Sequence, residues 1–246
     1  MNSADRPGTL RIVGMGPGDP ELMTVKAARL LAEAPAVAFF HKRGRRGHAR
    51  QIAGALLRPD ACELAFEYPF TTELSVADPA YAEGISRFYD GCADRLAAVL
   101  GEGSDALLLC EGDPFFFGSA MYLFDRLRHR FPCEVVPGVT GMSGCWSAAS
   151  LPFVHGDDTF AVLPGTLEED RLAERLGSCD AAVIMKVGRN MAKIRRALRR
   201  AGLENRAVYV ERGTQDGQVL SRLVERDRDD APYFSMVLVP GRRGPR

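Results

Sequence analysis

The sequence predicts an α/β protein built from two α/β domains with a ligand cleft between them. Short apolar runs such as residues 106–110 and 181–185 are typical of buried strands. Each is followed by a turn that contains glycine or proline and then by a segment of helical periodicity. The segment Phe131-Pro132-Cys133 interrupts this alternation. We therefore predict an N-terminal domain over residues 1–131 and a C-terminal domain over residues 132–246, with the cleft between them.

The overall composition is that of a soluble globular protein without a global charge. Of the 246 residues, 46% are hydrophobic and 26% are charged, and the formal net charge is zero. Such a chain has no overall field that would recruit nucleic acid or an acidic membrane surface. No apolar run approaches the roughly 20 residues of a membrane-spanning helix, and Met1 to Gly8 lack a signal-peptide core, so we expect a cytoplasmic protein. The cysteines and histidines show no metal-ligand spacing, and no metal site is expected.

The first strand, residues 10–13, runs into a glycine-rich loop, residues 14–20, and Thr24 then caps a helix. This order suggests the dinucleotide-binding fingerprint. However, Asp19 stands where the third glycine belongs, and Pro17 lacks an amide donor, so a nicotinamide-dependent dehydrogenase is disfavoured. We interpret the loop as a compact backbone wall against a ligand that is not a diphosphate. A plain turn between strand and helix is the alternative.

A local cluster of positive charge follows the second predicted strand, residues 36–40. Residues 41–50 hold five cationic side chains and two histidines. A glycine-containing loop of this kind, placed just after a strand, indicates an anion site, and a solvated loop is the alternative. Three further segments are expected next: a helix over residues 51–57, an extended aromatic segment at a cleft rim or sheet edge over residues 67–72, and a helix over residues 81–101.

The stretch around which the chain is organised follows the buried strand 106–110. Its turn, Gly112-Asp113-Pro114, leads through three phenylalanines to Ser119, which we expect to cap a helix over residues 120–130. A glycine and a carboxylate at the end of a central strand stand where open α/β sheets bind ligands. Gly112 allows a close approach, Asp113 offers two acceptor oxygens, and the phenylalanines would form an apolar wall. The alternative is a tight turn with core phenylalanines.

The C-terminal half repeats the alternation of strands and helices. Strands are predicted over residues 134–136, 160–163, 181–185, 207–210 and 233–239, and helices over residues 167–176 and 191–201. After the first of these strands comes a helix of small residues. Thr140 lies near its N-terminus, where a hydroxyl and free amides can hold a polar group. The cationic residues of the 191–201 helix are interpreted as a solvated face: Lys193, Arg195, Arg196, Arg199 and Arg200.

Four of these loops, in this order and spacing, resemble those of the tetrapyrrole methylases, a family that uses S-adenosylmethionine. They are residues 14–19, residues 111–114 with residues 117–119, residues 136–140 and residues 211–214. Each motif alone is weak, but together they cover nearly the whole chain. The resemblance implies a homodimer of two-domain subunits with the cofactor in the cleft between the domains. It puts the cofactor against these positions: Pro17, Glu111, Gly112, Asp113, Phe116 or Phe117, Thr140, Gly141, Met185, Gly213 and Pro240.

Within the family, further segments resemble the members that methylate carbon 20 of an early corrin precursor in cobalamin biosynthesis. They are residues 67–72, 162–166, 183–190 and 232–235. A cobalt-containing precursor, or another ring position, is the alternative inside the family, and a non-catalytic module that binds an anion is one outside it. The implied tetrapyrrole substrate carries many carboxylates. Its candidate contacts are therefore Lys42, Arg43, Arg45, Arg46, Arg50, Tyr68, Lys186 and Arg189.

The implied reaction displaces a methyl group from a sulfonium to an electron-rich carbon. Because the sulfonium already activates the methyl group, most of the rate can come from positioning in a water-poor cleft. We therefore hypothesise that no side chain is essential as an acid or base, and that Asp113 orients the cofactor. The proton that leaves the methylated carbon still needs an acceptor. Glu111, His41 and Tyr68 are unranked candidates for that task.

Overall fold

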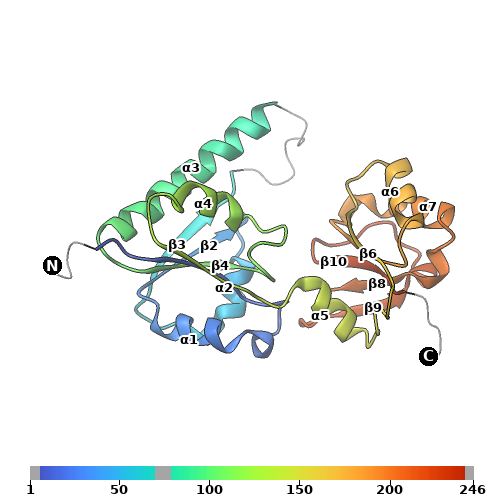
Figure 1. The fold of residues 1–246 in the computed structure, drawn as a ribbon, viewed down its shortest axis with the longest axis horizontal. Coiled ribbons are helices and arrows are strands. Elements are labelled where there is room, and N and C mark those ends of the chain that lie inside the picture. Colours follow the sequence, from blue (N-terminus) through green and yellow to red (C-terminus); the bar gives the residue numbers. More distant parts are fainter. Residues whose placement is uncertain (1–5, 70–78, 242–246) are drawn as a thin grey trace. The chain divides into compact units, whose positions relative to one another are not determined.

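The computed structural model describes residues 6–69 and 79–241 of the 246-residue chain (Figure 1). It divides into two compact parts, Met1–Thr140 and Gly141–Arg246, which we call the N-terminal unit and the C-terminal unit. The division falls after Thr140 rather than after residue 131. The reason is that β5 (Cys133–Val136) pairs in parallel with β1 (Leu10–Gly14) and so belongs to the N-terminal sheet.

A parallel sheet of five strands lies at the centre of the described N-terminal unit. Its strand order is β3-β2-β4-β1-β5. The strands not yet given are β2 (Ala36–His41), β3 (Cys62–Glu67) and β4 (Ala106–Cys110). All five residues of β4 are buried, which is why this strand is a continuous apolar run in the sequence.

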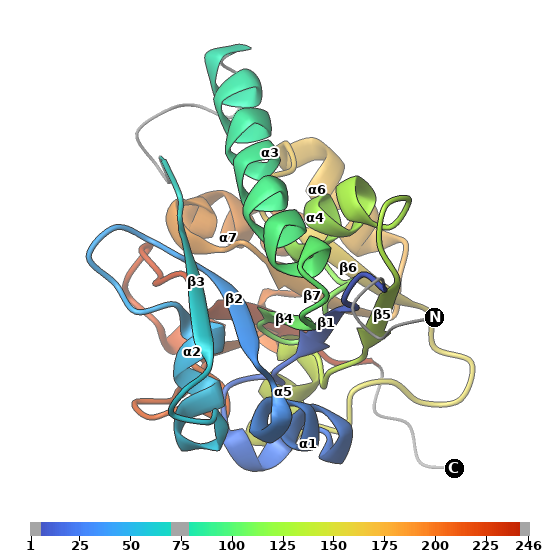
Figure 2. The ribbon, with the colours of Figure 1, turned by 90° about the vertical axis from the view of Figure 1, so that its left-hand side faces the viewer.

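Helices cover both faces of this sheet. They are α1 (Val25–Glu33), α2 (His48–Ala53), α3 (Pro79–Gly101) and α4 (Ala120–Leu127). Successive residues of β4 point to opposite faces, so Leu108 packs in the core under α3 and α4, whereas Leu109 packs in the core over α1 and α2. Figure 2 shows the two helix pairs on the two sides of the sheet. None of the described helices is long and apolar enough to span a membrane.

The adjacent strands β1 and β4 feed helices on opposite faces of the sheet. From β1 the chain passes through α1 to β2, and from β4 it passes through α4 to β5. The two loops therefore diverge at the carboxyl edge of the sheet, which is where open α/β sheets bind ligands. Residues 15–19 and 111–119 lie in these loops. The strand order thus brings the two glycine-containing loops singled out in the sequence side by side.

The beginnings of α1 and α4 are built differently. Thr24 caps α1 as predicted, because its hydroxyl accepts a hydrogen bond from the amide of Ala27 at 3.2 Å. The prediction that Ser119 caps α4 is wrong, since the Ser119 side chain makes no capping bond. The sulfur of Cys110 meets the amide of Ala120, in the first turn, instead.

The C-terminal unit contains a mixed sheet. In the described residues its strand order is β6-β7-β10-β8-β9, and the β6–β7 pair is parallel while the other pairs are antiparallel. The strands are β6 (Phe160–Pro164), β7 (Ala181–Met185), β8 (Val208–Glu211), β9 (Val219–Arg222) and β10 (Ser235–Val239). The helices are α5 (Gly141–Ala148), α6 (Glu169–Gly177) and α7 (Met191–Arg200). α6 and α7 pack on one face and α5 on the other, where Trp146 stacks on Phe153.

The burial of Arg195 contradicts the prediction that all the cationic residues of α7 form a solvated face. The residue is 7% exposed, and its guanidinium donates to the carbonyl of Leu223 at 2.9 Å and to that of Arg226. Asp229 lies 2.9 Å from Nε, and Glu204 lies 3.8 Å from Nη1. Arg195 is therefore a buried structural group that ties α7 to the chain between β9 and β10.

Candidate functional site

Three glycines meet backbone to backbone at the carboxyl edge of the N-terminal sheet. Gly14 ends β1, and Gly112 and Gly138 lie in the loops after β4 and β5. A Cβ atom on Gly14 would lie 2.6 Å from the carbonyl oxygen of Gly112 and 2.7 Å from Cα of Gly138, and one on Gly138 would lie 2.1 Å from the same oxygen. Only glycine fits such contacts. We call these three residues the glycine hub.

The glycine hub is joined to the first loop by an isolated β-bridge. The amide of Gly112 donates to the carbonyl of Gly16 at 2.8 Å, and Pro17 next to it is buried. The sequence predicts a close ligand approach at Gly112, but not at Gly14 or Gly138. The signal was available, because each of these glycines ends or closely follows an apolar strand within a motif.

Asp113 fixes the turn after β4 with both of its carboxylate oxygens. Oδ1 accepts from the amide of Phe115 at 2.9 Å, and Oδ2 accepts from the amide of Gly138 at 3.1 Å. The second bond ties the turn to the glycine hub. Each carboxylate oxygen still has a lone pair for a ligand hydroxyl. The predicted cofactor contact of Asp113 is thus compatible with the structural task that the side chain performs.

The phenylalanines after Asp113 do not form a buried core. Phe115 and Phe117 are 46% and 47% exposed, and Phe116 is partly buried with its ring edge-on to Phe117 at 5.0 Å between centroids. Phe117 has a φ of 56°, a left-handed conformation that an aromatic residue rarely adopts. Exposed rings beside a glycine-lined backbone are suited to cover an apolar ligand surface.

Tyr68, a predicted substrate contact, is bonded inside the N-terminal unit. It follows β3, and its phenol donates to Oγ of Ser119 at 2.7 Å. Its ring stacks on Phe40, with 5.3 Å between centroids. Sequence reasoning missed this bond, because nothing in the sequence links two residues so far apart. The neighbouring residues Phe70, Thr71 and Thr72 of the predicted rim lie outside the described residues.

The three candidate proton acceptors differ in their surroundings. Desolvation by neighbouring groups raises the pKa of the exposed Glu111 carboxyl, although the amide of Ala49 and the ammonium of Lys42 act against this. The Glu111 side chain keeps contact with solvent, which limits the rise. Nδ1 of His41 lies 3.1 Å from the carbonyl of Lys42, which can only accept a hydrogen bond, so in the neutral ring Nε2 is the nitrogen with the lone pair. The phenol of Tyr68 donates a hydrogen bond to Ser119.

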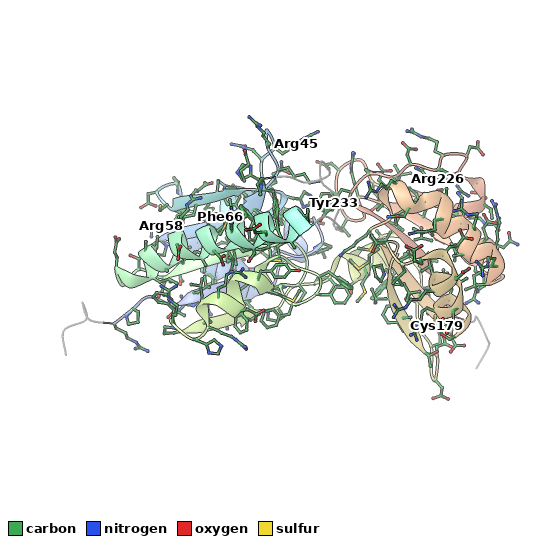
Figure 3. All side chains as sticks on the ribbon, turned by 90° about the horizontal axis from the view of Figure 1, so that it is seen from above. Arg45, Arg58, Phe66, Cys179, Arg226 and Tyr233 are labelled. Carbon is green, nitrogen blue, oxygen red and sulfur yellow. The ribbon has the colours of Figure 1, made fainter. Side chains whose placement is uncertain are left out.

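The cationic segment, residues 42–50, lies beside this edge after β2. Arg43, Arg45 and Arg46 are exposed, and Figure 3 shows Arg45 projecting outward from the N-terminal unit. Arg50 differs, because its guanidinium is paired with both oxygens of Glu63 at 2.8 and 3.0 Å. A cavity of about 380 Å³ lies here and is lined in part by Arg46, Arg50 and Glu63. The predicted cations therefore share one surface, but Arg50 is already neutralised.

The predicted residues of the C-terminal unit lie at the ends of its strands and at the start of α5. A Cβ on Gly213, after β8, would lie 2.9 Å from Sγ of Cys145, so only glycine allows α5 to pack there. Gly141 begins α5, and a Cβ on it would lie 3.2 Å from the side chain of Met236. Pro240 follows β10, and its carbonyl accepts from the Arg206 guanidinium.

The chain at the end of β7 carries three further predicted residues. Met185 is partly buried, and its carbonyl accepts from the amide of Gly165 at 2.7 Å. Lys186 and Arg189 follow it and are exposed, and Lys186 has a φ of 54°. The predicted site residues thus form one set in the N-terminal unit, ending with Thr140, and one set in the C-terminal unit. In the residues described, no group of three or more acidic, histidine or cysteine side chains could hold a metal ion.

Comparison with known proteins gives a family and close relatives. The model of the family described as Tetrapyrrole (Corrin/Porphyrin) Methylases matches residues 9–227. A precorrin-2 C(20)-methyltransferase from Sinorhizobium sp is 54% identical over 95% of this chain and 96% of its own. A cobalt-precorrin-2 C(20)-methyltransferase from Salmonella typhimurium is 30% identical over 94% of this chain and 96% of its own. The structure of uroporphyrin-III C-methyl transferase from Thermus thermophilus complexed with S-adenyl homocysteine is similar, with a TM-score of 0.62 and 29% identity, over 94% of this chain and 97% of that one.

Proposed function

The chain belongs to the tetrapyrrole (corrin/porphyrin) methylases, and we propose on that premise that it methylates carbon 20 of precorrin-2, giving precorrin-3A, in cobalamin biosynthesis. The observation that carries the proposal is the identity shared with the Sinorhizobium enzyme over nearly the full length of both chains. The relative that acts on a cobalt-containing substrate shares much less. We therefore favour the metal-free substrate.

The glycine hub supports S-adenosylmethionine as the methyl donor. Its three backbones pack directly on one another, which brings the loops after β1, β4 and β5 together at the edge where open α/β sheets bind ligands. Asp113 holds that backbone and keeps lone pairs for a hydroxyl. The exposed rings of Phe115 and Phe117 can exclude water from the same edge. When bound, the cofactor supplies a methyl group already activated by the sulfonium.

The cationic segment supports an anionic substrate. Arg43 and Arg45 are exposed, and no hydrogen bond or ion pair joins their side chains to the residues that the structure describes. Guanidinium groups of this kind can take the peripheral carboxylates of a tetrapyrrole in paired hydrogen bonds. Lys186 and Arg189 are the corresponding candidates in the C-terminal unit. We propose that these residues orient the macrocycle rather than take part in bond making.

The methylated bridge carbon must lose a proton, and we rank its three candidate acceptors by the contacts of their side chains. Carbon 20 gains the methyl group, and the electron pair of its C–H bond returns to the macrocycle as the proton leaves. Tyr68 is the least suited acceptor, because its phenol is the donor of the hydrogen bond to Ser119. Glu111 and the free Nε2 of His41 rank above it. The proposal also includes a cytoplasmic homodimer, which the family resemblance implies.

The test is a product analysis of the purified chain. It is incubated without oxygen with precorrin-2 and S-adenosylmethionine labelled with ¹³C in the methyl group. We expect one added methyl group, with an NMR signal that assigns it to carbon 20. Transfer only to the cobalt complex of the substrate would replace the metal-free assignment. Transfer to a different carbon would contradict the proposed position, and sedimentation of the same sample tests the dimer.

A further inference from the structure

Ser119 stands at the start of α4, yet its hydroxyl serves another part of the N-terminal unit. In most helices a serine at this position accepts from the first-turn amides. Here Cys110 meets the amide of Ala120, and the Ser119 hydroxyl accepts from Tyr68 at 2.7 Å. The bond joins the end of the edge strand β3 to the turn that follows the central strand β4. It therefore links two strands that are not neighbours in the sheet.

Tyr68 is itself held in place by its surroundings. Its amide donates to the carbonyl of His41 at 3.0 Å, and its ring packs between Phe40 and Phe88, at centroid distances of 5.3 and 5.2 Å. The buried phenol of Tyr89, on α3, also interacts with the hydroxyls of Tyr68 and Ser119. A phenol restrained on several sides loses little further entropy when it bonds to a serine. Tyr68 can thus fix the position of Ser119.

The turn that ends at Ser119 contains a strained backbone. Phe117 is left-handed, with a φ of 56°, and a Cβ on Gly118 would lie 2.7 Å from the carbonyl oxygen of Pro114. Such conformations persist only where the neighbouring structure over-determines them, and they cluster at ligand sites. Asp113 fixes the beginning of this turn through its bond to the amide of Phe115. The Tyr68–Ser119 bond fixes its end.

We propose that Ser119 is a positioning residue. Tyr68 and Tyr89 hold its hydroxyl, and Ser119 in turn holds the rings of Phe116 and Phe117 where they contact the S-adenosyl group. The inference rests on the proposed function, because that function supplies the ligand. It gives Tyr68 a role different from the two predicted for it, since it acts through Ser119 and not on the substrate. The hydroxyl of Ser119 is the part of the side chain that matters.

The test is a double-mutant cycle read by the affinity for S-adenosylhomocysteine. Tyr68→Phe and Ser119→Ala are each expected to weaken binding about fivefold, the effect of one lost hydrogen bond. The double variant should lose no more than Ser119→Ala alone, because Ser119→Ala already removes the hydroxyl to which Tyr68 donates. Ser119→Thr keeps a hydroxyl and should keep the affinity. Tyr122→Phe is the matched control, because Tyr122 stacks on Tyr89 and its hydroxyl makes no hydrogen bond within the described residues.

Calorimetry gives the affinities, thermal unfolding verifies that each variant is folded, and steady-state methyl transfer separates KM from kcat. The positioning role predicts a higher KM for the methyl donor, with kcat at saturating donor changed less than about threefold and an unaltered pH profile. Additive losses, or single variants with wild-type affinity, would contradict it. A fall in kcat of Tyr68→Phe with unchanged affinity would assign Tyr68 to the substrate and overturn it. Failure of the wild-type chain to bind S-adenosylhomocysteine would instead remove the proposed function, and the positioning role with it.

Discussion

Two segments of this neutral chain are rich in arginine, and the fold uses them differently. In the cationic segment, residues 42–50, Arg43 and Arg45 are exposed and without an ion pair among the described residues. In α7, Arg195 is buried against two carbonyls and two carboxylates, and the three exposed arginines of the helix each face a carboxylate of a neighbouring element. The amino-acid sequence gives both segments a similar composition.

The difference indicates that the pairing of a charge, more than its presence, distinguishes a binding surface from a structural one. An arginine that already meets carboxylates inside the protein has little to offer an incoming anion, and its removal leaves buried partners unpaired. An unpaired surface guanidinium can bind a ligand carboxylate without first breaking another contact. We therefore assign the substrate carboxylates to the cationic segment and a structural role to α7.

The largest expected effect is on stability and comes from α7. Arg195→Ala should lower the free energy of unfolding by about 2–4 kcal/mol, because it leaves the carbonyls of Leu223 and Arg226 without the guanidinium that donates to them. Trp146, the only tryptophan of the chain, lies in the same unit, so its fluorescence during urea unfolding reports the change. Arg196→Ala, on the exposed side of α7, is the control and should cost less than about 1 kcal/mol. Equal losses of stability for both variants would contradict the structural role assigned to Arg195.

The next effect is on substrate binding and comes from the cationic segment. The double variant Arg43→Ala with Arg45→Ala should raise the KM for the tetrapyrrole about tenfold to a hundredfold, as expected for lost bonds to charged groups. The melting temperature and kcat should change little, since neither side chain has a described partner. Steady-state assays at saturating methyl donor measure the effect. An unchanged KM would remove the anion site from this segment.

Arg50 is the intermediate case, because it lies in the cationic segment but is paired with Glu63. The pair is partly exposed, so Arg50→Ala should cost about 0.5–1 kcal/mol of stability and should raise the KM for the substrate less than about threefold. Chemical unfolding and steady-state assays on one preparation measure both effects. A KM increase as large as that of the double variant would mean that the ion pair opens for the ligand.

The smallest expected effect is the pH dependence of the stability that the Arg50–Glu63 ion pair contributes. Hydrogen bonds from Arg50 lower the pKa of Glu63 below its ordinary value, against partial desolvation. The pair therefore stabilises the fold above the unfolded pKa of about 4.3, and this contribution is lost as the pH falls through the lower folded pKa. The stability difference between the wild-type chain and Arg50→Ala should shrink between about pH 5 and pH 3. A difference that stays constant in urea unfolding over this range would contradict the ion pair.

The sequence allowed the buried strands to be predicted, but not the strands at the sheet edges. β4 and β7 are almost wholly buried, and a continuous apolar run marks a strand of this kind. Of β3, only Phe66 is buried, and no residue of β9 is buried, so neither carries a clear pattern. The pairing of β5 with β1 is a long-range contact as well. That contact explains why the two units divide later than predicted.

The same limit applies to the candidate site. Its loops could be found from the sequence, because glycines and charges follow apolar strands at fixed places. The bonds from Tyr68 to Ser119 and from Arg50 to Glu63 could not, since each joins residues that only the fold brings together. The burial of Arg195 likewise depends on the chain around Leu223, far from α7 in the sequence. Composition indicates which residues can bind a ligand, and the contacts indicate which remain available.

The most direct test of this account compares three proteins in one assay. The wild-type chain, Arg43→Ala with Arg45→Ala, and Arg196→Ala with Arg200→Ala are given precorrin-2 and labelled S-adenosylmethionine over a range of substrate concentrations. We predict the same product, methylated at carbon 20, from all three, with a raised KM only when the cationic segment is changed. No methylation by the wild-type chain, or an equal rise in KM for both variants, would contradict the account.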